Sequence, residues 1–205
     1  MDDKITAVLE VYHARIRDEE AARPDTPAAR DKNWHDSRLL AVGPDTGRLI
    51  NILARSLPTP NILELGTSYG YSAIWLAEAA HANGGRVTTM ELAAHKSAYA
   101  REMSVKAGLA DHVDFKVGNA VELISELKTG LDFVLVDLWK DLYVPCLEAF
   151  YPKLNPGALI VADNMIHPRS DDTRAYAEAV RAKPGLETVR LPVGSGLDIS
   201  RFGGF

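Results

Sequence analysis

The sequence predicts an α/β fold in which one mostly parallel sheet is covered by helices on both faces. Short apolar runs with the length of buried strands alternate with longer segments in which apolar residues recur at helical spacing. Glycines follow several of these segments and favour tight turns there. The chain has 205 residues, 46% of them hydrophobic, which suffices for one α/β domain with a sizeable core.

An amphipathic helix is expected over residues 1–20, where apolar side chains recur at helical spacing. They are Ile5, Val8, Leu9, Tyr12 and Ile16. This helix covers the domain or a partner subunit, so it is where we would expect a homodimer. The pattern then dissolves up to Asp36, which predicts a loop. We therefore expect one domain over residues 1–205, with residues 1–36 as a cap of helix and loop.

The first strand of the sheet is expected to follow a helix that begins at Asp45 or Thr46, either of which can serve as its N-cap. The apolar face of that helix holds Leu49, Ile50, Leu53 and Leu57. Pro58 and Pro60 keep the helix from running into the strand, because a residue before proline is biased away from the helical conformation.

Strands and helices alternate through the rest of the chain. The expected strands are residues 61–65, 86–91, 113–117, 131–137, 158–163, 187–193 and 197–202. The expected helices are residues 71–83, 94–107, 120–128 and 172–182. Residues 131–137 are almost continuously apolar, as in a strand covered on both faces. Asn155-Pro156-Gly157 is expected to be a turn, and the last of the seven strands is expected to be antiparallel.

Composition excludes several classes of partner. The formal net charge is −5 and the pI is about 5.7, and no strongly basic segment offsets this balance, so a nucleic acid is not expected. Cys146 is the single cysteine, which excludes an internal disulfide and fits a cytoplasmic location. No signal segment and no membrane-spanning apolar run is visible, so no membrane association is expected.

The loop after the first expected strand is the clearest candidate for a ligand site. Gly66 and Gly70 can adopt positive φ and let the backbone approach a ligand closely. The helix that starts at Tyr71 offers free amides, which favour a carboxylate or phosphate. The spacing is not G-x-G-x-x-G, so the dinucleotide fingerprint is absent. The alternative is that the glycines only make a tight connection.

Carboxylates end four of the expected strands. They are Glu64, Glu91, Asp137 and Asp163. Ligands of open parallel sheets bind at the carboxyl ends of the strands, so these acids suggest a polar site along one edge. Glu91, one strand from the glycine loop, is placed to accept the two hydroxyls of a ribose, and the alternative is a solvated acid.

Asp137 and the pair Asp163-Asn164 form a second candidate site. Two carboxylates and an amide oxygen are hard ligands that suit Mg²⁺, with Ca²⁺ or Mn²⁺ as alternatives, whereas zinc would require histidine or cysteine. Lys140 comes three residues after Asp137. A nearby divalent cation and partial burial would favour the neutral amine that a general base needs. The alternatives are a turn at Asp163-Asn164 and a surface lysine paired with Asp141.

These motifs resemble those of the catechol O-methyltransferases. The segment 137–143, Asp-Leu-Trp-Lys-Asp-Leu-Tyr, is similar to their metal-and-lysine motif, and Ala162-Asp163-Asn164 with Pro168 is similar to their second metal motif. Residues 62–72 resemble their S-adenosylmethionine (SAM) loop and Val42-Gly43 their cofactor-covering segment. The resemblance spans about residues 40–168 with the same order and spacing. It implies a Rossmann-like class I SAM methyltransferase with a seven-stranded sheet.

The resemblance also implies residue roles. It implies Mg²⁺ ligation by Asp137, Asp163 and Asn164, and it makes Lys140 the catalytic base. The implied substrate contacts are Lys140, Asn164, Pro168 and Asp198. The implied SAM contacts are Val42, Gly43, Glu64, Gly66, Ser68, Gly70, Tyr71, Ser72, Glu91, Leu92, Gly118, Asn119, Ala120, Asp137 and Trp139.

The chain also departs from the family pattern at three places. Leu138 stands where the family has a histidine beside the adenine, and Asp198 is one methylene shorter than the family's glutamate. Arg38 and Leu39 precede Val42 without an obvious aromatic gate. We expect the substrate walls to come from residues 25–41, 165–173 and 194–205, with Trp34 either there or packed against the body. Catechol itself is therefore not named as the substrate.

The implied activity is Mg²⁺-dependent methyl transfer from SAM to a hydroxyl of a small catechol-like aromatic diol. One alternative keeps the fold and methylates a hydroxyuridine in tRNA, which the acidic balance disfavours. A second is a nicotinamide-dependent oxidoreductase, which shares the layered architecture but is disfavoured by the glycine spacing. A third is a non-catalytic SAM-binding protein, which the intact lysine and metal motifs disfavour.

Overall fold

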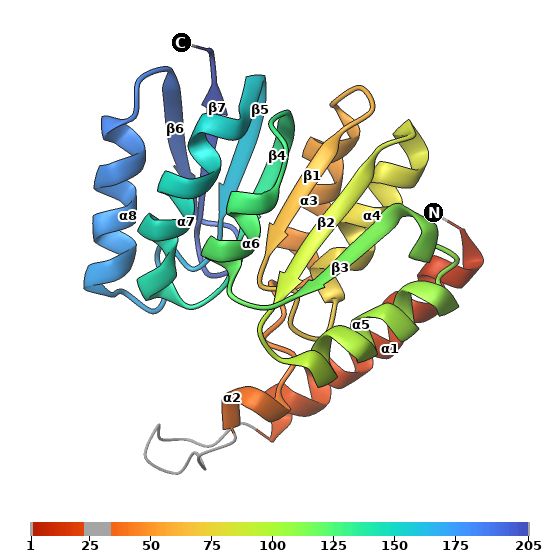
Figure 1. Ribbon diagram of the computed structural model, residues 1–205. Coiled ribbons are helices and arrows are strands. Elements are labelled where there is room, and N and C mark those ends of the chain that lie inside the picture. The colour runs from red at the N-terminus through yellow and green to blue at the C-terminus, as the bar shows by residue number, and fades with distance from the viewer. Residues whose placement is uncertain (1, 23–33, 205) are drawn as a thin grey trace.

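The computed structural model of the chain describes residues 2–22 and 34–204, and seven strands in these residues form one sheet (Figure 1). They are β1 (Asn61–Leu65), β2 (Arg86–Glu91), β3 (Val113–Val117), β4 (Leu131–Val136), β5 (Leu154–Ala162), β6 (Leu186–Leu191) and β7 (Leu197–Phe202). The strand order is β3-β2-β1-β4-β5-β7-β6. Strands β1 to β5 pair in parallel, whereas β7 runs antiparallel to both neighbours. The predicted fold is confirmed.

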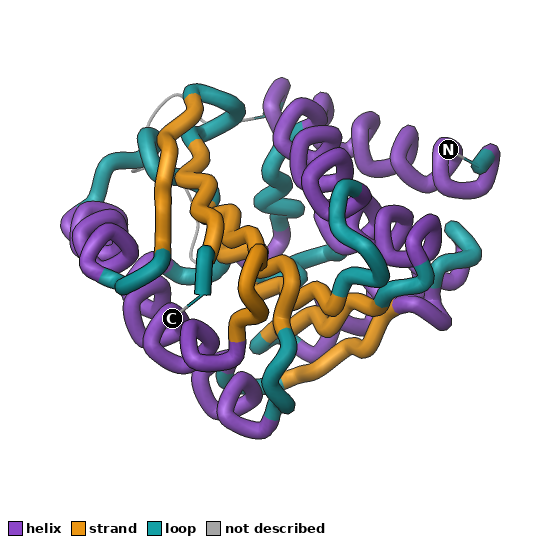
Figure 2. The backbone as a smooth tube through the Cα atoms, turned by 90° about the horizontal axis from the view of Figure 1, so that it is seen from above, coloured by secondary structure: helices purple, strands orange, loops and turns teal. Residues whose placement is uncertain are grey.

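Helices cover both faces of this sheet, and seen from above the strands lie between two helical layers (Figure 2). The helices are α1 (Asp3–Ala21), α2 (Trp34–Ser37), α3 (Pro44–Arg55), α4 (Tyr71–Asn83), α5 (Ala94–Lys106), α6 (Ala120–Glu126), α7 (Tyr143–Phe150) and α8 (Asp171–Ala182). Short 3₁₀ turns occupy Ala110–His112, Lys140–Leu142 and Tyr151–Lys153. Helices α1, α3, α4 and α5 pack into one core, and α6, α7 and α8 into the other.

Strand β4 shows why the central run is apolar throughout. Phe133 and Leu135 enter the core on the α4 side, whereas Val134 and Val136 enter the core on the α7 side, and all four are fully buried. Because successive side chains of a strand point to opposite faces, a strand covered twice needs apolar residues at every position.

The chain changes direction along the sheet between β1 and β4, which are neighbours in space but not in sequence. The segment after β1 leads into α4 on one face, and the segment after β4 leads into α7 on the other. Such a switch point leaves a crevice at the carboxyl ends of the strands, where ligands of open α/β sheets bind.

Two predictions near the N-terminus are wrong. Helix α3 is capped by Gly43, with Pro44 as its first residue, and not by Asp45 or Thr46. Proline fits the first helical position because its missing N–H would have no partner there. The short helix α2 lies in the segment expected to be loop. Residues 23–33 of that segment, and the part of the expected substrate wall that falls on them, lie outside the described residues.

Two further differences concern β5 and α7. Asn155-Pro156-Gly157 does not precede β5 but lies within it, as a bulge: Leu131 pairs with Leu154, and the next register pair joins Phe133 to Leu159. Helix α7 was not predicted, because Pro145 interrupts its pattern. A proline in the first turn of a helix removes no intrahelical hydrogen bond, so it does not prevent the helix. Other boundaries differ by one or two residues.

Within the described ranges, none of the helices has the length and apolar character that crossing a bilayer requires.

Candidate functional site

A cavity of about 570 Å³ opens at the carboxyl ends of the parallel strands. Its floor is formed by residues that end or follow β1, β2, β3, β4 and β5, and its far wall comes from α1, α2 and the segment before α3. The volume lies in the range of sites that enclose small molecules.

Gly66 allows two loops to meet on one side of this cavity. Its φ is +98°, and a Cβ built there would overlap the carbonyl oxygen of Asp137. The amides of Gly66 and Thr67 both donate to the carbonyl oxygen of Met90, at 3.0 and 3.1 Å. Because only glycine combines this φ with this close approach, the residue is required by packing as well as by any ligand.

Glu91 ends β2 with its carboxylate fixed by backbone amides. Oε2 accepts from the Ser68 amide at 2.8 Å, and Oε1 accepts from the Ala93 amide at 2.9 Å. Each carboxylate oxygen retains a further lone pair, and the residue lines the cavity. This geometry suits acceptance of two hydroxyls from a bound ribose.

Glu64 lies beneath the cavity and not in its wall. The residue is fully buried, and its Oε2 accepts from the Thr89 hydroxyl at 2.5 Å. Burial raises the pKa of Glu64 to about 7, although hydrogen bonds from Ser72 and Thr89 lower it. Its carboxyl therefore ties β1 to β2 and positions the glycine loop indirectly.

Lys140 is the centre of the polar cluster that follows β4. Its Nζ lies 2.5 Å from Asn164 Oδ1, 2.6 Å from the Tyr143 hydroxyl and 3.4 Å from Asp137 Oδ1. The Tyr143 hydroxyl donates to the Asp163 carbonyl oxygen at 3.1 Å. Tyr143 was not singled out from the sequence, although its place three residues after Lys140 was a usable signal.

The two carboxylates near Lys140 are those of Asp137 and Asp163, and both have a raised pKa. Asp163 is 2% exposed, and its Oδ1 has no hydrogen-bond partner in the part of the chain that the structure describes. Burial, together with the nearby charge of Asp137, raises the pKa of Asp163 to about 8, and burial also raises the pKa of Asp137 against the opposing effect of Lys140. Two such carboxylates beside the Asn164 oxygen make a donor set that fits a hard divalent cation.

The described ranges contain no group of three or more His, Cys, Asp or Glu side chains that could hold a metal ion. The proposed ligands Asp137, Asp163 and Asn164 do not form such a group, because one of the three oxygen donors is the side-chain amide of Asn164. Asn164 has a φ of +58°, which asparagine tolerates better than most residues. The turn expected at Asp163-Asn164 and the proposed ligand role are therefore compatible.

Thirteen of the residues selected from the sequence line the cavity together. They are Gly66, Ser68, Glu91, Leu92, Gly118, Asn119, Ala120, Asp137, Trp139, Lys140, Asp163, Asn164 and Pro168. The selected residues outside the lining are Val42, Gly43, Glu64, Gly70, Tyr71, Ser72 and Asp198. Val42 is buried in the core, and Gly43 and Gly70 cap helices, so these act through the backbone or through packing.

Of the four predicted substrate contacts, that of Asp198 has the least support from the geometry. Its side chain is buried, and its two carboxylate oxygens accept from Arg190 Nε and Nη2 at 2.6 and 2.7 Å. The two residues face each other across β6 and β7. This bidentate pair occupies the carboxylate, so a contact with a substrate stays a prediction.

The N-terminal elements that line the cavity are called its cover here, defined as α1, α2 and the segment Arg38–Ala41. Asp36 lies 3.5 Å from His95 Nε2 and 3.7 Å from Lys96 Nζ, and the His35 ring meets the Trp139 ring edge-on at 5.6 Å. Trp34 lines the cavity as well. Sequence periodicity did not indicate these contacts, because α2 is a single turn.

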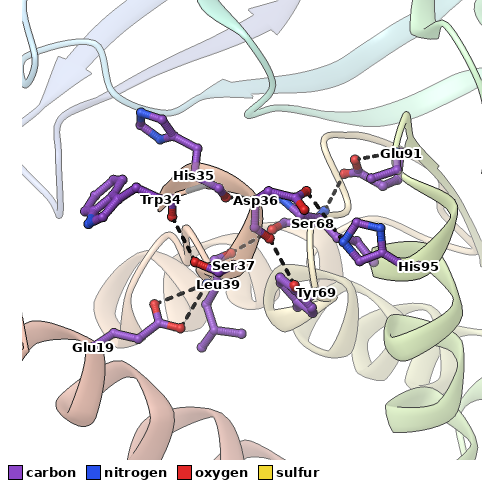
Figure 3. A network of polar contacts seen from close by, with 12 residues as sticks. Glu19, Trp34, His35, Asp36, Ser37, Leu39, Ser68, Tyr69, Glu91 and His95 are labelled. Atoms are coloured by element: carbon purple, nitrogen blue, oxygen red, sulfur yellow. Dashed lines mark hydrogen bonds and ion pairs between the residues drawn. The ribbon is translucent and has the colours of Figure 1, made fainter. Parts of the chain in front are cut away.

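The cover is tied to the glycine loop by hydrogen bonds. The Ser68 hydroxyl donates to the Leu39 carbonyl oxygen at 2.8 Å, and the Tyr12 hydroxyl donates to the Tyr69 carbonyl oxygen at 2.6 Å. The Leu39 amide in turn donates to both carboxylate oxygens of Glu19 at 3.2 Å (Figure 3). The loop is therefore held from outside as well as from the sheet.

Solved structures with this fold include methyltransferases. The chain aligns over 98% of its length with the O-methyltransferase of Bacillus cereus in complex with SAH, at a TM-score of 0.75 and 27% identity, and covers 91% of that chain. The sheet, the glycine loop and the acid-lined cavity thus define a SAM-dependent methyltransferase.

The chain belongs to the O-methyltransferase family, whose model matches residues 29–201. It is 32% identical over 163 residues to a catechol O-methyltransferase of Mycobacterium tuberculosis, covering 74% of each chain. It is 36% identical over 131 residues to a catechol O-methyltransferase of Niastella koreensis, covering 62% of this chain but only 59% of that protein. A caffeoyl-CoA O-methyltransferase of Eucalyptus globulus is 28% identical, with 82% of this chain and 76% of that protein covered. The protein is a SAM-dependent O-methyltransferase.

Proposed function

We propose that the protein transfers a methyl group from SAM to one hydroxyl of a small catechol-like aromatic diol, and that the transfer requires Mg²⁺. The single observation that carries the proposal is the cluster around Lys140. Its amine, the unpartnered oxygen of Asp163 and the amide oxygen of Asn164 lie in the cavity that the glycine loop and Glu91 also line.

SAM is proposed to lie along the part of the cavity formed by β1, β2 and β3. Glu91 would accept hydrogen bonds from the ribose hydroxyls, with its carboxylate already aimed by Ser68 and Ala93. Gly118, Asn119 and Trp139 would flank the adenine. Trp139 is 56% exposed, which a bound aromatic base would reduce.

Mg²⁺, or Ca²⁺ or Mn²⁺ in its place, would be held by Asp137, Asp163 and Asn164. When bound, the ion would supply a lower pKa for a hydroxyl of the diol and a fixed position for both oxygens. Lys140 then accepts the proton of the attacking hydroxyl at Nζ, and its contacts with Tyr143 and Asn164 orient the amine. The deprotonated oxygen then attacks the methyl carbon of SAM opposite the sulfur. The carbon–sulfur bond breaks, and the products are the methyl ether and S-adenosylhomocysteine.

The cavity is proposed to contribute to the rate mainly through orientation. Holding the acceptor oxygen and the methyl group in contact converts a bimolecular step into an effectively unimolecular one, which is worth roughly 7–11 kcal/mol. The cover over the cavity excludes water from this encounter. Vicinal diols fit the proposal because two adjacent oxygens can ligate one ion, whereas a monophenol offers one.

A panel assay tests the proposal. Protein treated with a chelator and then given labelled SAM would be supplied with vicinal diols, monophenols or bulk tRNA, with and without Mg²⁺. We expect methylation of vicinal diols only, and only with the metal restored. Asp163→Ala should lose this metal response, whereas the exposed matched control Asp111→Ala should keep it.

Three results would contradict the proposal. Full activity in excess chelator would show that the reaction needs no metal. Equal rates on monophenols would show that the substrate does not chelate an ion. Labelling of tRNA alone would make the hydroxyuridine alternative correct. The family assignment already disfavours the nicotinamide-dependent oxidoreductase and the non-catalytic protein.

A further inference from the structure

Arg38 places a fixed positive charge in the wall of the cavity, on the side of the cover. Its Nη1 donates to the Glu19 carbonyl oxygen at 2.5 Å, and its guanidinium carbon lies 4.7 Å from the centroid of the Trp34 ring. These contacts hold the plane of the guanidinium but use one of its five N–H donors. The group is therefore oriented in advance, and its remaining N–H groups have no hydrogen-bond acceptor within residues 2–22 and 34–204.

No carboxylate of the described residues forms an ion pair with Arg38. Glu19 directs its carboxylate elsewhere, to Arg15 Nε at 2.9 Å and to the Leu39 amide. Glu20 lines the same cavity, but it is exposed on α1 and makes no ion pair with Arg38. A guanidinium that is half-buried, stacked on an aromatic ring and without a carboxylate partner among the described residues matches the usual arrangement for binding a planar anion.

The other cations of the cavity have carboxylate neighbours. Lys96 Nζ lies 3.7 Å from Asp36 and 3.2 Å from the His35 carbonyl oxygen, and Lys140 contacts Asp137 and Asn164. Among the described residues that line the cavity, Arg38 is thus the one arginine or lysine without a carboxylate neighbour, and it is available to bind a negative charge on a ligand. Arg38 lies on the cover and the cluster around Lys140 lies at the strand ends, and both line the same cavity.

We propose that Arg38 binds an acidic group of the substrate, and that the preferred acceptors are vicinal aromatic diols that carry a carboxylate. The inference rests on the proposed function, because it assumes that the diol end of the molecule lies at Lys140. A carboxylate on the opposite side of the ring, or at the end of a short side chain, would then accept two parallel hydrogen bonds from the guanidinium.

The test compares matched substrates in matched variants. The acids are protocatechuate and caffeate, and the neutral counterparts are their methyl esters, each assayed with saturating SAM and Mg²⁺. We expect the native protein to show a kcat/KM for the acids that is about tenfold or more above that for the esters. Added salt should reduce this ratio, because the interaction is between charges at a partly solvated site.

Substitutions at Arg38 should change the ratio itself. Arg38→Gln should bring the acid-to-ester ratio close to one, and Arg38→Lys should retain part of it because the charge remains but the planar fork is lost. Arg38→Glu should favour a catechol that carries an aminoethyl group over the acids. Arg17→Gln removes a positive charge from an exposed site on α1 and should leave the ratio unchanged. Thermal melts and SAM affinity of each variant establish that it is folded.

The outcomes separate this inference from the function on which it rests. Methylation of acids and esters with equal kcat/KM, or an acid preference that Arg38→Gln retains, would overturn the role of Arg38 alone. A preference for the coenzyme A thioester of caffeate over the free acid, unchanged in Arg38→Gln, would also overturn it. If the SAM-bound protein methylates no diol at all, the proposed function is wrong and this inference falls with it.

Discussion

Lys140 Nζ lies within hydrogen-bond distance of oxygens from Asp137, Leu138, Tyr143 and Asn164. At the scale of single residues, this is where charge, burial and chemistry coincide. An amine in such a setting is positioned by its neighbours and not by its own flexible stem, which is the condition for proton transfer at a defined point.

Replacing Lys140 by methionine should therefore lower turnover by about 10²–10⁴-fold, because the proton would have to leave without a positioned base. SAM affinity should stay within a few-fold of the native value. Single-turnover methyl transfer and calorimetric SAM titration measure the two quantities. Lys116→Met, at a partly exposed lysine paired with Asp114, is the matched control. Normal turnover in Lys140→Met would show that the base is another group.

Glu64 should make stability depend on pH. Its folded pKa is about 7 against an ordinary 4.5, so between these values the folded protein holds a proton that the unfolded chain has released. Stability contributed by this group is thus complete below about pH 4.5 and falls as the pH rises to about 7, by up to about 3 kcal/mol.

Glu64→Gln should remove this fall. The variant should gain stability relative to the native protein as the pH increases from about 4.5 to 7, and the difference should then level off. Urea unfolding at several pH values measures it, with the exposed Glu126→Gln as control. Asp137 and Asp163 are present in both proteins, so the part of their pH dependence that does not involve Glu64 cancels. A difference that does not change with pH would show that Glu64 is not the group responsible.

Residue identity and spacing were enough to select Asp137, Lys140, Asp163 and Asn164, which the fold brings into one cluster. They could be selected because each follows a strand, and strand ends meet at one edge of a parallel sheet. The pair between Arg190 and Asp198 could not be predicted in this way. It depends on the register of β6 against β7, and short strands do not specify their register from sequence alone.

At the scale of elements, the loop between β1 and α4 requires glycine for two separate reasons. Gly66 combines a positive φ with close contact to the backbone after β4, whereas Gly84, at the end of α4, has a positive φ of +71° with open space around it. Comparing the two positions therefore separates backbone strain from steric overlap.

Gly84→Ala should cost about 1–2 kcal/mol of unfolding free energy, because only the left-handed backbone is penalised. Gly66→Ala should cost more than about 3 kcal/mol, because the new methyl group displaces the segment that carries Asp137. It should also weaken SAM binding. Urea unfolding and SAM titration of both variants measure these effects. Equal losses in the two variants would contradict the packing argument.

Elements whose signal is local were predicted well, and those that depend on tertiary contacts were not. The strand β4 was evident from its uninterrupted apolar run. Helix α7 was missed because Pro145 resembles a breaker, and α2 was missed because a single turn has no periodicity. The Asn155-Pro156-Gly157 segment has turn chemistry, but residues on both sides of it pair with β4, so it forms a bulge within β5.

At the scale of the whole molecule, the prediction concerns the equilibrium between the folded and unfolded chain. SAM binds the folded cavity, so a concentration one hundred times its Kd should stabilise the protein by about 2.7 kcal/mol. NAD should give no comparable effect, because the loop after β1 lacks the dinucleotide spacing. Thermal melts with each ligand measure this. Stabilisation by NAD equal to that by SAM would contradict the assignment of the cavity.

The sequence indicated the overall architecture because strands and helices alternate and the central strand is apolar on both faces. It also led us to expect a cap over residues 1–36 and a substrate wall over residues 25–41, but it did not indicate the contacts of the cover, because they join residues far apart in the chain. The Ser68–Leu39 and Tyr12–Tyr69 hydrogen bonds are examples. The expected homodimer and the single-domain boundaries stay predictions.

The ties between the cover and the loop after β1 have a practical consequence for anyone who shortens this protein. Removing α1 would leave every SAM contact proposed here in the polypeptide, yet it would take away the Tyr12–Tyr69 hydrogen bond and the Glu19 carboxylate that holds Leu39. A trimmed enzyme would therefore be expected to fold its sheet and still hold its methyl donor loosely.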